Sequence, residues 1–343
     1  MKKLIAISLL ILPSLLMADA LTGDSKTDSF SPPGLTVENL TDWVPGAYDL
    51  CIHNMLLNGS DSLTVGEIRQ QCANIKAPEQ PLSKRHLSEV LTEKNPFVIT
   101  PHRLNYAIFG HYTSDVNQTP FELQNPDTPL HYENSELQFQ VSFKFPLAKK
   151  VIYDTFDVYA AYTNRSFWQF FDDKDSIPFR ETNHEPELWA EFHANLDIFD
   201  FNLHKILIGV NHQSNGQSGL LSRGWNRVFV QGLLQRPEGY LSFKTWQRFE
   251  EDDEFDNSFD YAKYLGDYEI ELGYRFNQHT LGMTLRNRYL VNPYGSVQLD
   301  YTYPLTKKIK GYVQWFNGYG DSLIDMDHHH NKIGIGVVLA DRI

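Results

Sequence analysis

Residues 137–145 read Leu-Gln-Phe-Gln-Val-Ser-Phe-Lys-Phe, with an apolar side chain at each odd position and a polar one at each even position. Successive side chains of a β-strand point to opposite faces, so this alternation predicts a strand with one apolar and one polar face. The pattern returns in about a dozen segments from about residue 100 onward. Clear examples are residues 188–196, 268–276, 297–303 and 333–343. We therefore expect an all-β protein built from antiparallel strands.

The lengths of these segments and of their connections indicate how the sheet is arranged. Many segments approach the roughly 9–11 residues that a tilted transmembrane strand needs. Short turns, such as 277–279 and 304–308, alternate with longer polar loops, such as 113–132 and 249–260. A soluble sandwich buries its apolar faces, whereas an outer-membrane barrel turns them to lipid and lines its interior with polar side chains. Charged residues on the second face of nearly every strand, together with the loop pattern, favour the barrel.

The composition excludes several other classes of protein. The 343 residues include 30 Lys and Arg against 43 Asp and Glu, and this net charge of −13 argues against a nucleic-acid-binding protein, which needs a basic patch. The only long apolar run, Leu4–Met17, is shorter than the roughly 18 residues of a membrane helix and contains Pro13. The 22 Phe, 18 Tyr and 6 Trp argue against a disordered chain.

Residues 1–20 have the pattern of a secretory signal peptide. Lys2 and Lys3 precede the apolar run, and Ala18-Asp19-Ala20 matches an A-x-A cleavage site, so we expect the mature chain to begin at Leu21. An N-terminal membrane anchor is the alternative, although the apolar run is short for a membrane span. The sequence therefore predicts an exported protein.

Residues 21–95 lack the strand pattern, and we expect a partly helical N-terminal extension there, followed by the barrel domain at 96–343. Thr64 and Glu67 are spaced as a helix capping box, and Ser83 is suited to begin a second short helix. Cys51 and Cys72 are the only cysteines. Export permits a disulfide between them, and two free thiols are the alternative.

Three residues of the chain are candidates for a catalytic group: His212, Ser214 and Asn226. His212 and Ser214 are two residues apart on a predicted strand, so their side chains leave the same face. A serine hydroxyl becomes nucleophilic beside a base, usually an imidazole, and the base needs a third group to orient it. Asn226, on the next predicted strand, offers an amide oxygen that can accept from the imidazole N–H.

The parity of the two strands places this group relative to the membrane. Ile208 and Val210 share a face with His212 and Ser214, and Val228 shares a face with Asn226. If the apolar faces meet lipid, the three residues lie outside the barrel, where a lipid ester is the accessible substrate. Taken alone, the His-x-Ser motif is weak, and these residues are then better explained as polar groups near a strand end.

The wider pattern resembles the outer-membrane phospholipase A family over about residues 96–343. The matching stretches are His212-x-Ser214-Asn215-Gly216, Ser222-Arg223-x-Trp225-Asn226-Arg227, Tyr162-Thr163, Trp168-Gln169, Ser176-x-Pro178-Phe179-Arg180-Glu181-Thr182-Asn183-x-Glu185-Pro186 and Gly318-Tyr319-Gly320-Asp321-Ser322-Leu323-Ile324-Asp325. This resemblance implies a 12-stranded antiparallel barrel in the outer membrane of a Gram-negative bacterium. It also implies calcium-dependent hydrolysis of phospholipid acyl esters, of the phospholipase A1/A2 and lysophospholipase type.

The resemblance also implies a role for each site residue. Ser214 is then the nucleophile, His212 the general base and Asn226 the residue that orients it, with the Gly216 amide facing the oxyanion. The implied Ca²⁺ ligands are the Gln217 carbonyl and the Ser222 hydroxyl of one subunit and the Ser176 hydroxyl of the other. The enzyme is then active as a homodimer and inactive as a monomer. Family members often carry Arg at the Gln217 position, but a main-chain carbonyl does not depend on the side chain.

Two rival functions belong to other classes. A non-enzymatic porin or adhesin barrel conducts ions or binds partners and releases no fatty acid. A secreted soluble lipase is disfavoured because the chain lacks the G-x-S-x-G elbow of such enzymes.

Overall fold

The computed structural model describes residues 51–52, 55–56, 62–73, 85, 89, 99–127, 130–172, 179–249, 261–286, 293–306 and 309–340. The expected signal peptide and the candidate ligand Ser176 lie outside these residues, and of the helix expected after Ser83 only Arg85 and Glu89 are described, both in helical conformation. All described residues belong to one unit, Ala47–Ile343.

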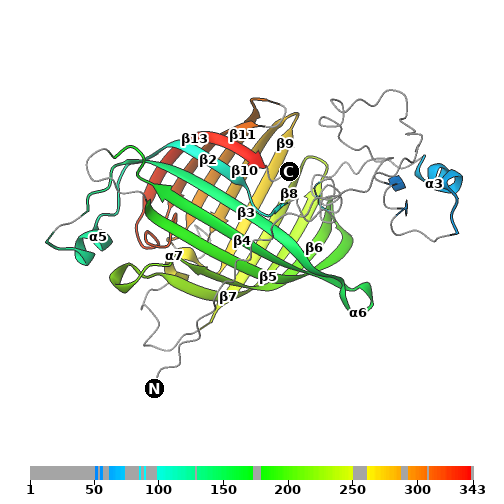
Figure 1. Ribbon diagram of the computed structural model, residues 1–343, viewed down its shortest axis with the longest axis horizontal. Helices are drawn as coiled ribbons and strands as arrows, with labels where there is room; N and C mark the ends of the chain where they lie inside the picture. The colour runs from blue at the N-terminus through cyan, green and yellow to red at the C-terminus, as the bar shows by residue number, and fades with distance from the viewer. Residues whose placement is uncertain are drawn as a thin grey trace, which may run out of the picture. The chain divides into compact units, whose positions relative to one another are not determined.

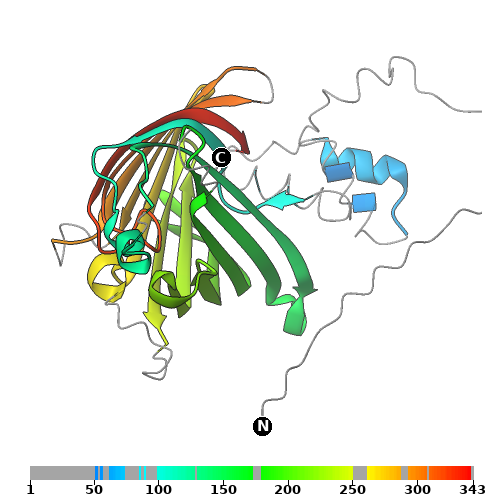
Figure 2. The ribbon, with the colours of Figure 1, turned by 60° about the vertical axis from the view of Figure 1, so that its left-hand side comes forward.

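Twelve long antiparallel strands form a closed ring, which confirms the predicted barrel (Figures 1 and 2). Each strand pairs with the next along the chain, and the last pairs with the first, β13 with β2. The strands are β2 (Asn105–Thr113), β3 (Ser135–Lys150), β4 (Phe156–Trp168), β5 (Phe179–Ile198), β6 (Phe201–Ser214), β7 (Gly224–Arg236), β8 (Gly239–Arg248), β9 (Tyr268–Phe276), β10 (His279–Arg286), β11 (Ser296–Pro304), β12 (Lys310–Gly318) and β13 (His330–Ala340). A two-residue strand, β1 (Thr100–Pro101), pairs with Phe143 and Lys144 of β3.

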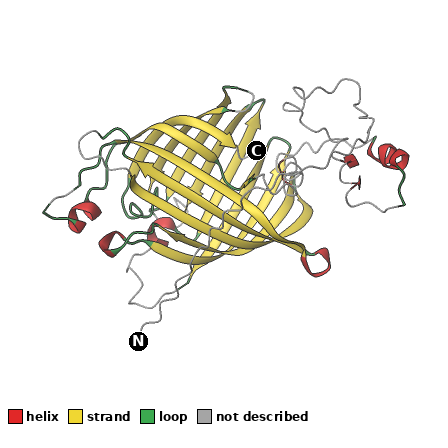
Figure 3. Ribbon diagram, in the orientation of Figure 1, coloured by secondary structure: helices red, strands yellow, loops and turns green. Residues whose placement is uncertain are grey.

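The described helices are short and lie outside the strands (Figure 3). They are α3 (Val65–Cys72), α5 (Thr119–Gln124), α6 (Val151–Asp154), α7 (Tyr261–Leu265) and the 3₁₀ turn η1 (Gly219–Leu221). In Figure 1, α6 caps the β3–β4 turn at one end of the barrel, and α5 and α7 lie in loops at the other end. Among the described residues, no helix has the length and apolar character needed to cross a membrane.

The burial of β3 shows which face of the sheet is outside. Its polar residues Gln138, Ser142 and Lys144 are buried in the barrel interior, whereas Val141 and Phe145 are 50% and 46% exposed. The outer surface is therefore apolar and the interior polar, the reverse of a soluble sandwich and the arrangement of a transmembrane barrel. The prediction from alternation is confirmed.

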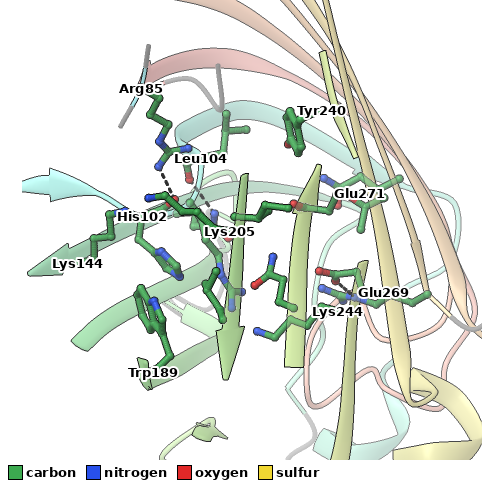
Figure 4. A pocket seen from close by; sticks show the side chains of 18 of the residues that line it. Arg85, His102, Leu104, Lys144, Trp189, Lys205, Tyr240, Lys244, Glu269 and Glu271 are labelled. Carbon is green, nitrogen blue, oxygen red and sulfur yellow. Dashed lines mark hydrogen bonds and ion pairs between the residues drawn. The ribbon is translucent and has the colours of Figure 1, made fainter. Parts of the chain in front are cut away.

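Ion pairs fill much of the interior. The guanidinium of Arg103 donates to Glu185 at 2.7 Å and to Glu187 at 2.7 Å, and Lys244 donates to Glu187 at 2.8 Å. A cavity of about 200 Å³ remains. Figure 4 shows charged side chains from several strands around it, among them Lys205, Lys244 and Glu269. Such buried charges are tolerated because each has a partner of opposite sign.

The loop between β12 and β13 folds into the barrel and closes part of it. Its residues Leu323, Ile324 and Met326 are buried, and Asp325 accepts from Arg180 of β5 at 2.7 Å. In the ring, β5 is separated from β13 by β2, β3 and β4, so this loop reaches across the lumen. A register shift in β4–β5 pairing turns both Arg180 and its neighbour Glu181 inward.

The described part of the N-terminal extension confirms two local predictions. Thr64 and Glu67 form the capping box at the start of α3, with the Glu67 N–H donating to the Thr64 hydroxyl at 3.3 Å. A disulfide joins Cys51 to Cys72. Farther along, Glu89 is buried and accepts from Lys144 of β3 at 2.8 Å, which ties this part of the chain to the barrel wall.

Candidate active site

The pairing of β6 with β7 brings two of the predicted site residues into contact. His212 lies directly opposite Asn226 in the register of these strands. The imidazole Nδ1 of His212 lies 2.8 Å from Oδ1 of Asn226. An amide oxygen only accepts, so Nδ1 carries the proton and Nε2 presents a lone pair. This is the tautomer that a general base toward a serine requires.

The group lies on the outer surface of the barrel. Asn211 and Arg227, the neighbours of His212 and Asn226 along their strands, are buried in the interior, whereas His212 is exposed and Asn226 half-buried. The exposed side chain of Val210 shares the face of His212. The site thus faces the apolar surroundings of the barrel, near the end of β6 that carries the longer loop.

Ser214 ends β6 on the same outer face, two residues beyond His212. Among the described residues its hydroxyl makes no hydrogen bond, and catalytic hydrogen bonds of this kind often tighten only when substrate binds. On one side it faces Gly224 of β7, which has no side chain, and on the other His184 of β5. No side chain therefore lies directly opposite Ser214 on the β7 side.

The β6–β7 loop is held in shape by Asn215. This buried side chain donates to the Leu221 carbonyl at 2.8 Å and accepts from the Arg223 N–H at 2.9 Å, which ties the two ends of the loop together. Its amide nitrogen also lies 3.3 Å from Oε2 of the buried Glu181. Gly216 follows with a φ of +66°, a conformation that favours glycine. The loop beside Ser214 is therefore well defined.

The residues expected to bind calcium lie partly in this same loop. Gln217 and Ser222 both lie between β6 and β7, and the Gln217 carbonyl accepts no backbone hydrogen bond within the described loop. Oxygen donors of this kind suit Ca²⁺. Ser176 lies outside the described residues, so its position relative to these two oxygens stays a prediction.

A charged network supports the strands behind the site. Arg227 donates through Nε to the Asn211 side-chain oxygen at 2.9 Å and through Nη2 to Glu185 at 3.2 Å. Its guanidinium lies 3.9 Å from the centre of the Trp225 ring. These interior contacts join β5, β6 and β7 at the level of His212 and Asn226, so they hold the outer residues in register.

Two residues of the site region, Asn215 and His184, were not predicted to act there. Asn215 stands within the quoted motifs, and its spacing from Ser214 carries no chemical signature. His184 occupies an unspecified position between Asn183 and Glu185. Only the pairing of β5 with β6 brings it beside Ser214.

Comparison with known proteins assigns the family. The family model described as Phospholipase A1 matches residues 82–339. A Phospholipase A1 of Proteus vulgaris is 37% identical over 248 residues, which cover 72% of this chain and 83% of that protein. The chain belongs to the phospholipase A1 family. The match begins at residue 82, so Arg85 and Glu89 lie within the family region.

Solved structures of outer-membrane members of the family have the same barrel. A Salmonella typhi outer membrane phospholipase, solved as a dimer with bound calcium, is 32% identical with a TM-score of 0.68, over 74% of this chain and 96% of that one. An Escherichia coli outer membrane phospholipase A, solved as an active-site mutant with an asparagine replaced by alanine, is 32% identical with a TM-score of 0.65, over 72% of this chain and 93% of that one. These similarities support an outer-membrane location for this phospholipase.

Proposed function

We propose that this member of the phospholipase A1 family is a calcium-dependent serine esterase of the outer membrane, with Ser214, His212 and Asn226 as its catalytic triad. Family membership supports phospholipid hydrolysis at the outer membrane. The observation that carries the finer proposal is the 2.8 Å contact between His212 Nδ1 and Asn226 Oδ1, on the outer face that also bears Ser214. An asparagine in the active site of the Escherichia coli relative is consistent with it.

The acylation step follows from the tautomer of His212. Nε2 accepts the Ser214 proton while Oγ attacks the carbonyl carbon of the acyl ester. The resulting tetrahedral intermediate collapses and breaks the bond to the alcohol oxygen of the lipid. That oxygen takes the proton from the imidazolium and leaves as the lysolipid alcohol, with the acyl group on Ser214.

Deacylation repeats the sequence with water. His212 accepts a proton from water as its oxygen attacks the acyl-serine carbonyl, and the second tetrahedral intermediate releases the fatty acid. The proton on the imidazolium returns to Ser214 Oγ, so the enzyme is restored. Asn226 keeps Nδ1 protonated in both steps but adds no negative charge, so it stabilises the imidazolium less than a carboxylate does.

The negative charge on the intermediate needs a stabilising environment, usually the largest catalytic contribution. The Gly216 N–H is the proposed backbone donor. The Gln217 carbonyl and the Ser222 hydroxyl, with Ser176 of the partner subunit, would hold Ca²⁺, which when bound would supply positive charge beside the ester carbonyl. Because this ligand set spans two subunits and contains no carboxylate, we propose that the homodimer is active and the monomer inactive.

The position of the triad defines the substrate. His212 shares the outer face with exposed Val210 and Ile208, so the reacting ester must reach the enzyme from the lipid phase. Phospholipids present their acyl esters at the boundary between acyl chains and headgroups. A site near the loop end of β6 is suited to that depth. The rival porin function is disfavoured because ion pairs and the β12–β13 loop occupy the lumen.

A hydrolysis assay with three variants tests the proposal. In mixed phospholipid–detergent micelles with calcium, we expect Ser214→Ala to abolish fatty-acid release. Asn226→Ala loses one hydrogen bond worth about 1–1.5 kcal/mol, so we expect a roughly ten-fold lower kcat. Ser218→Ala, which changes an exposed serine of the same loop, is the matched control and retains full activity.

Full phospholipid hydrolysis by Ser214→Ala would contradict the triad. Ion conduction in planar bilayers without fatty-acid release would instead support the porin. Reaction with an alkylsulfonyl fluoride, followed by peptide mapping, locates the nucleophile independently of turnover.

A further inference from the structure

A second imidazole, that of His184, lies beside Ser214 and takes no part in the proposed triad mechanism. His184 of β5 is directly opposite Ser214 in the β5–β6 register. Side chains directly opposite one another in an antiparallel pair have their Cβ atoms about 5 Å apart on the same face. Ser214 is therefore flanked by two histidines, His212 along its own strand and His184 across from it.

Hydrogen bonds on β4 assign the tautomer of His184. Its Nδ1 lies 2.6 Å from the Tyr162 hydroxyl and 3.4 Å from the Asn164 amide nitrogen. The Asn164 oxygen accepts from the Ser166 hydroxyl at 3.0 Å, so its NH₂ group is the one turned to the imidazole. An NH₂ group only donates, which makes Nδ1 of His184 the acceptor and leaves the proton on Nε2.

The two histidines thus have opposite tautomers. His212 has its proton on Nδ1 and a lone pair on Nε2, which suits a base. His184 has a lone pair on Nδ1 and its proton on Nε2, which suits a hydrogen-bond donor. Among the described residues Nε2 of His184 makes no hydrogen bond, so its N–H is available to a ligand.

The ring edge that carries this N–H lies close to Gly216, the proposed backbone donor. A Cβ built on Gly216 would lie 3.8 Å from Cδ2 and 3.9 Å from Nε2 of His184. The imidazole edge and the Gly216 backbone therefore border the same small space beside Ser214. Resting on the proposed function, we propose that His184 is a further catalytic residue, whose Nε2–H donates a hydrogen bond to the oxyanion formed when Ser214 attacks the ester.

The surroundings strengthen such a donor. In the apolar environment of the outer barrel surface, a fixed N–H stabilises a developing negative charge more than it does in water. The ring is already oriented by Tyr162 and Asn164, so little reorganisation is needed during the reaction. Gly216 and His184 would then contact the oxyanion from the β6–β7 loop and from β5.

Replacement of His184 tests the donor directly. His184→Phe keeps a flat ring, which is compatible with a lipid-facing position, and removes the N–H. Loss of one oxyanion donor typically lowers kcat about 10²–10³-fold. Other groups share the charge of the oxyanion here, so we expect kcat to fall only about ten- to hundred-fold. The hydrogen bond from His184 forms mainly in the transition state, so we expect little change in KM. His184→Gln, which retains a side-chain N–H, should recover part of the loss.

A double-mutant cycle separates catalysis from packing. Tyr162→Phe removes the hydroxyl that orients His184, so we expect a few-fold lower kcat in the parent background and no further loss in His184→Phe. All variants are compared as dimers, with the dimer fraction measured by cross-linking in the same calcium-containing micelles. Wild-type kcat in dimeric His184→Phe would overturn the role of His184, and so would equal losses from Tyr162→Phe in both backgrounds.

The same variants distinguish the donor role of His184 from the catalytic triad on which it rests. If Ser214→Ala keeps its activity, the triad itself fails. If Ser214→Ala is inactive and dimeric His184→Phe is fully active, the triad stands and only the donor role of His184 is wrong. Heat-dependent migration on SDS gels confirms that each variant barrel is folded before it is assayed.

Discussion

Gly216 is the residue at which backbone conformation and proposed chemistry meet. Its φ of +66° costs an L-residue about 1–2 kcal/mol, whereas glycine adopts it freely. We expect Gly216→Ala to shift the N–H beside Ser214 and to lower kcat roughly ten-fold or more, measured as fatty-acid release from micelles.

Gly219→Ala is the matched control for this prediction. Gly219 lies in the same loop with a φ of +62°, so the substitution imposes a similar strain away from Ser214. Equal losses of activity in the two variants would mean that loop strain, and not the position of the Gly216 amide, controls the rate.

Residues of the site differ in how well the sequence predicts them. His212 and Ser214 lie two apart on one strand, and Asn226 is on the adjacent strand, so alternation alone puts them on one face. The contact of His212 with Asn226 becomes possible because β6 and β7, which are consecutive in the chain, pair with one another. His184 could not be predicted, because its place opposite Ser214 depends on the register of a long β5–β6 hairpin with a bulge.

Among the contacts between elements of the fold, the least expected one joins the segment around Glu89 to the barrel wall. Glu89 is buried and accepts from Lys144 at 2.8 Å and from Arg85 at 2.8 Å. Arg85 also donates to the carbonyls of Pro101 and His102, at 2.9 and 2.6 Å. The extension is thus fastened to the wall by β1 and by a buried charge pair.

We expect Glu89→Gln to release this segment. Removing one partner of a buried ion pair leaves the other charge uncompensated and costs about 3–5 kcal/mol. Limited proteolysis should cut the variant faster around residues 85–104, while heat-dependent gel migration shows an intact barrel. Lys144→Met combined with Glu89→Gln should restore part of the protection, and Glu67→Gln, in the exposed capping box of α3, is the control. Unchanged proteolysis of Glu89→Gln would contradict the contact.

The same contact has a defined pH dependence. Although burial alone raises the pKa of the Glu89 carboxyl, the charges of Lys144 and Arg85 hold it well below its ordinary value. A carboxyl with a lowered pKa stabilises the folded contact above its unfolded pKa of about 4.3 and loses this contribution as the pH falls further. The segment should therefore stay protected from protease down to about pH 4 and become exposed only in stronger acid.

For the whole molecule, the proposed shared calcium site links metal binding to association. Sites with few or no carboxylate ligands bind Ca²⁺ weakly, so we expect half-maximal activity at roughly 10⁻⁴–10⁻³ M calcium. Cross-linking in micelles should show dimers with calcium and monomers with chelator.

We expect Ser222→Ala to raise the calcium concentration required for half-maximal activity about ten-fold, the effect of losing about 1.4 kcal/mol of binding free energy, with Ser218→Ala as control. Full activity in chelator would contradict the metal role even if the triad holds.

The sequence by itself determined the nature of each surface of this protein. Alternation with a period of two specifies which side chains of β3 or β6 share a face, because strand geometry is local. The same local rule predicted that Ser214 and His212 lie on the apolar face, and the capping box of α3 needed only residues three apart.

The tertiary structure alone decided what meets across the barrel. The register of β5 with β6 sets His184 against Ser214, and the β12–β13 loop reaches Arg180 only after the ring has closed. The pairing of Glu89 with Lys144 likewise joins residues far apart in the chain. These contacts depend on strand register and closure, which are set by many weak interactions summed over the whole sheet, and no single stretch of sequence encodes them.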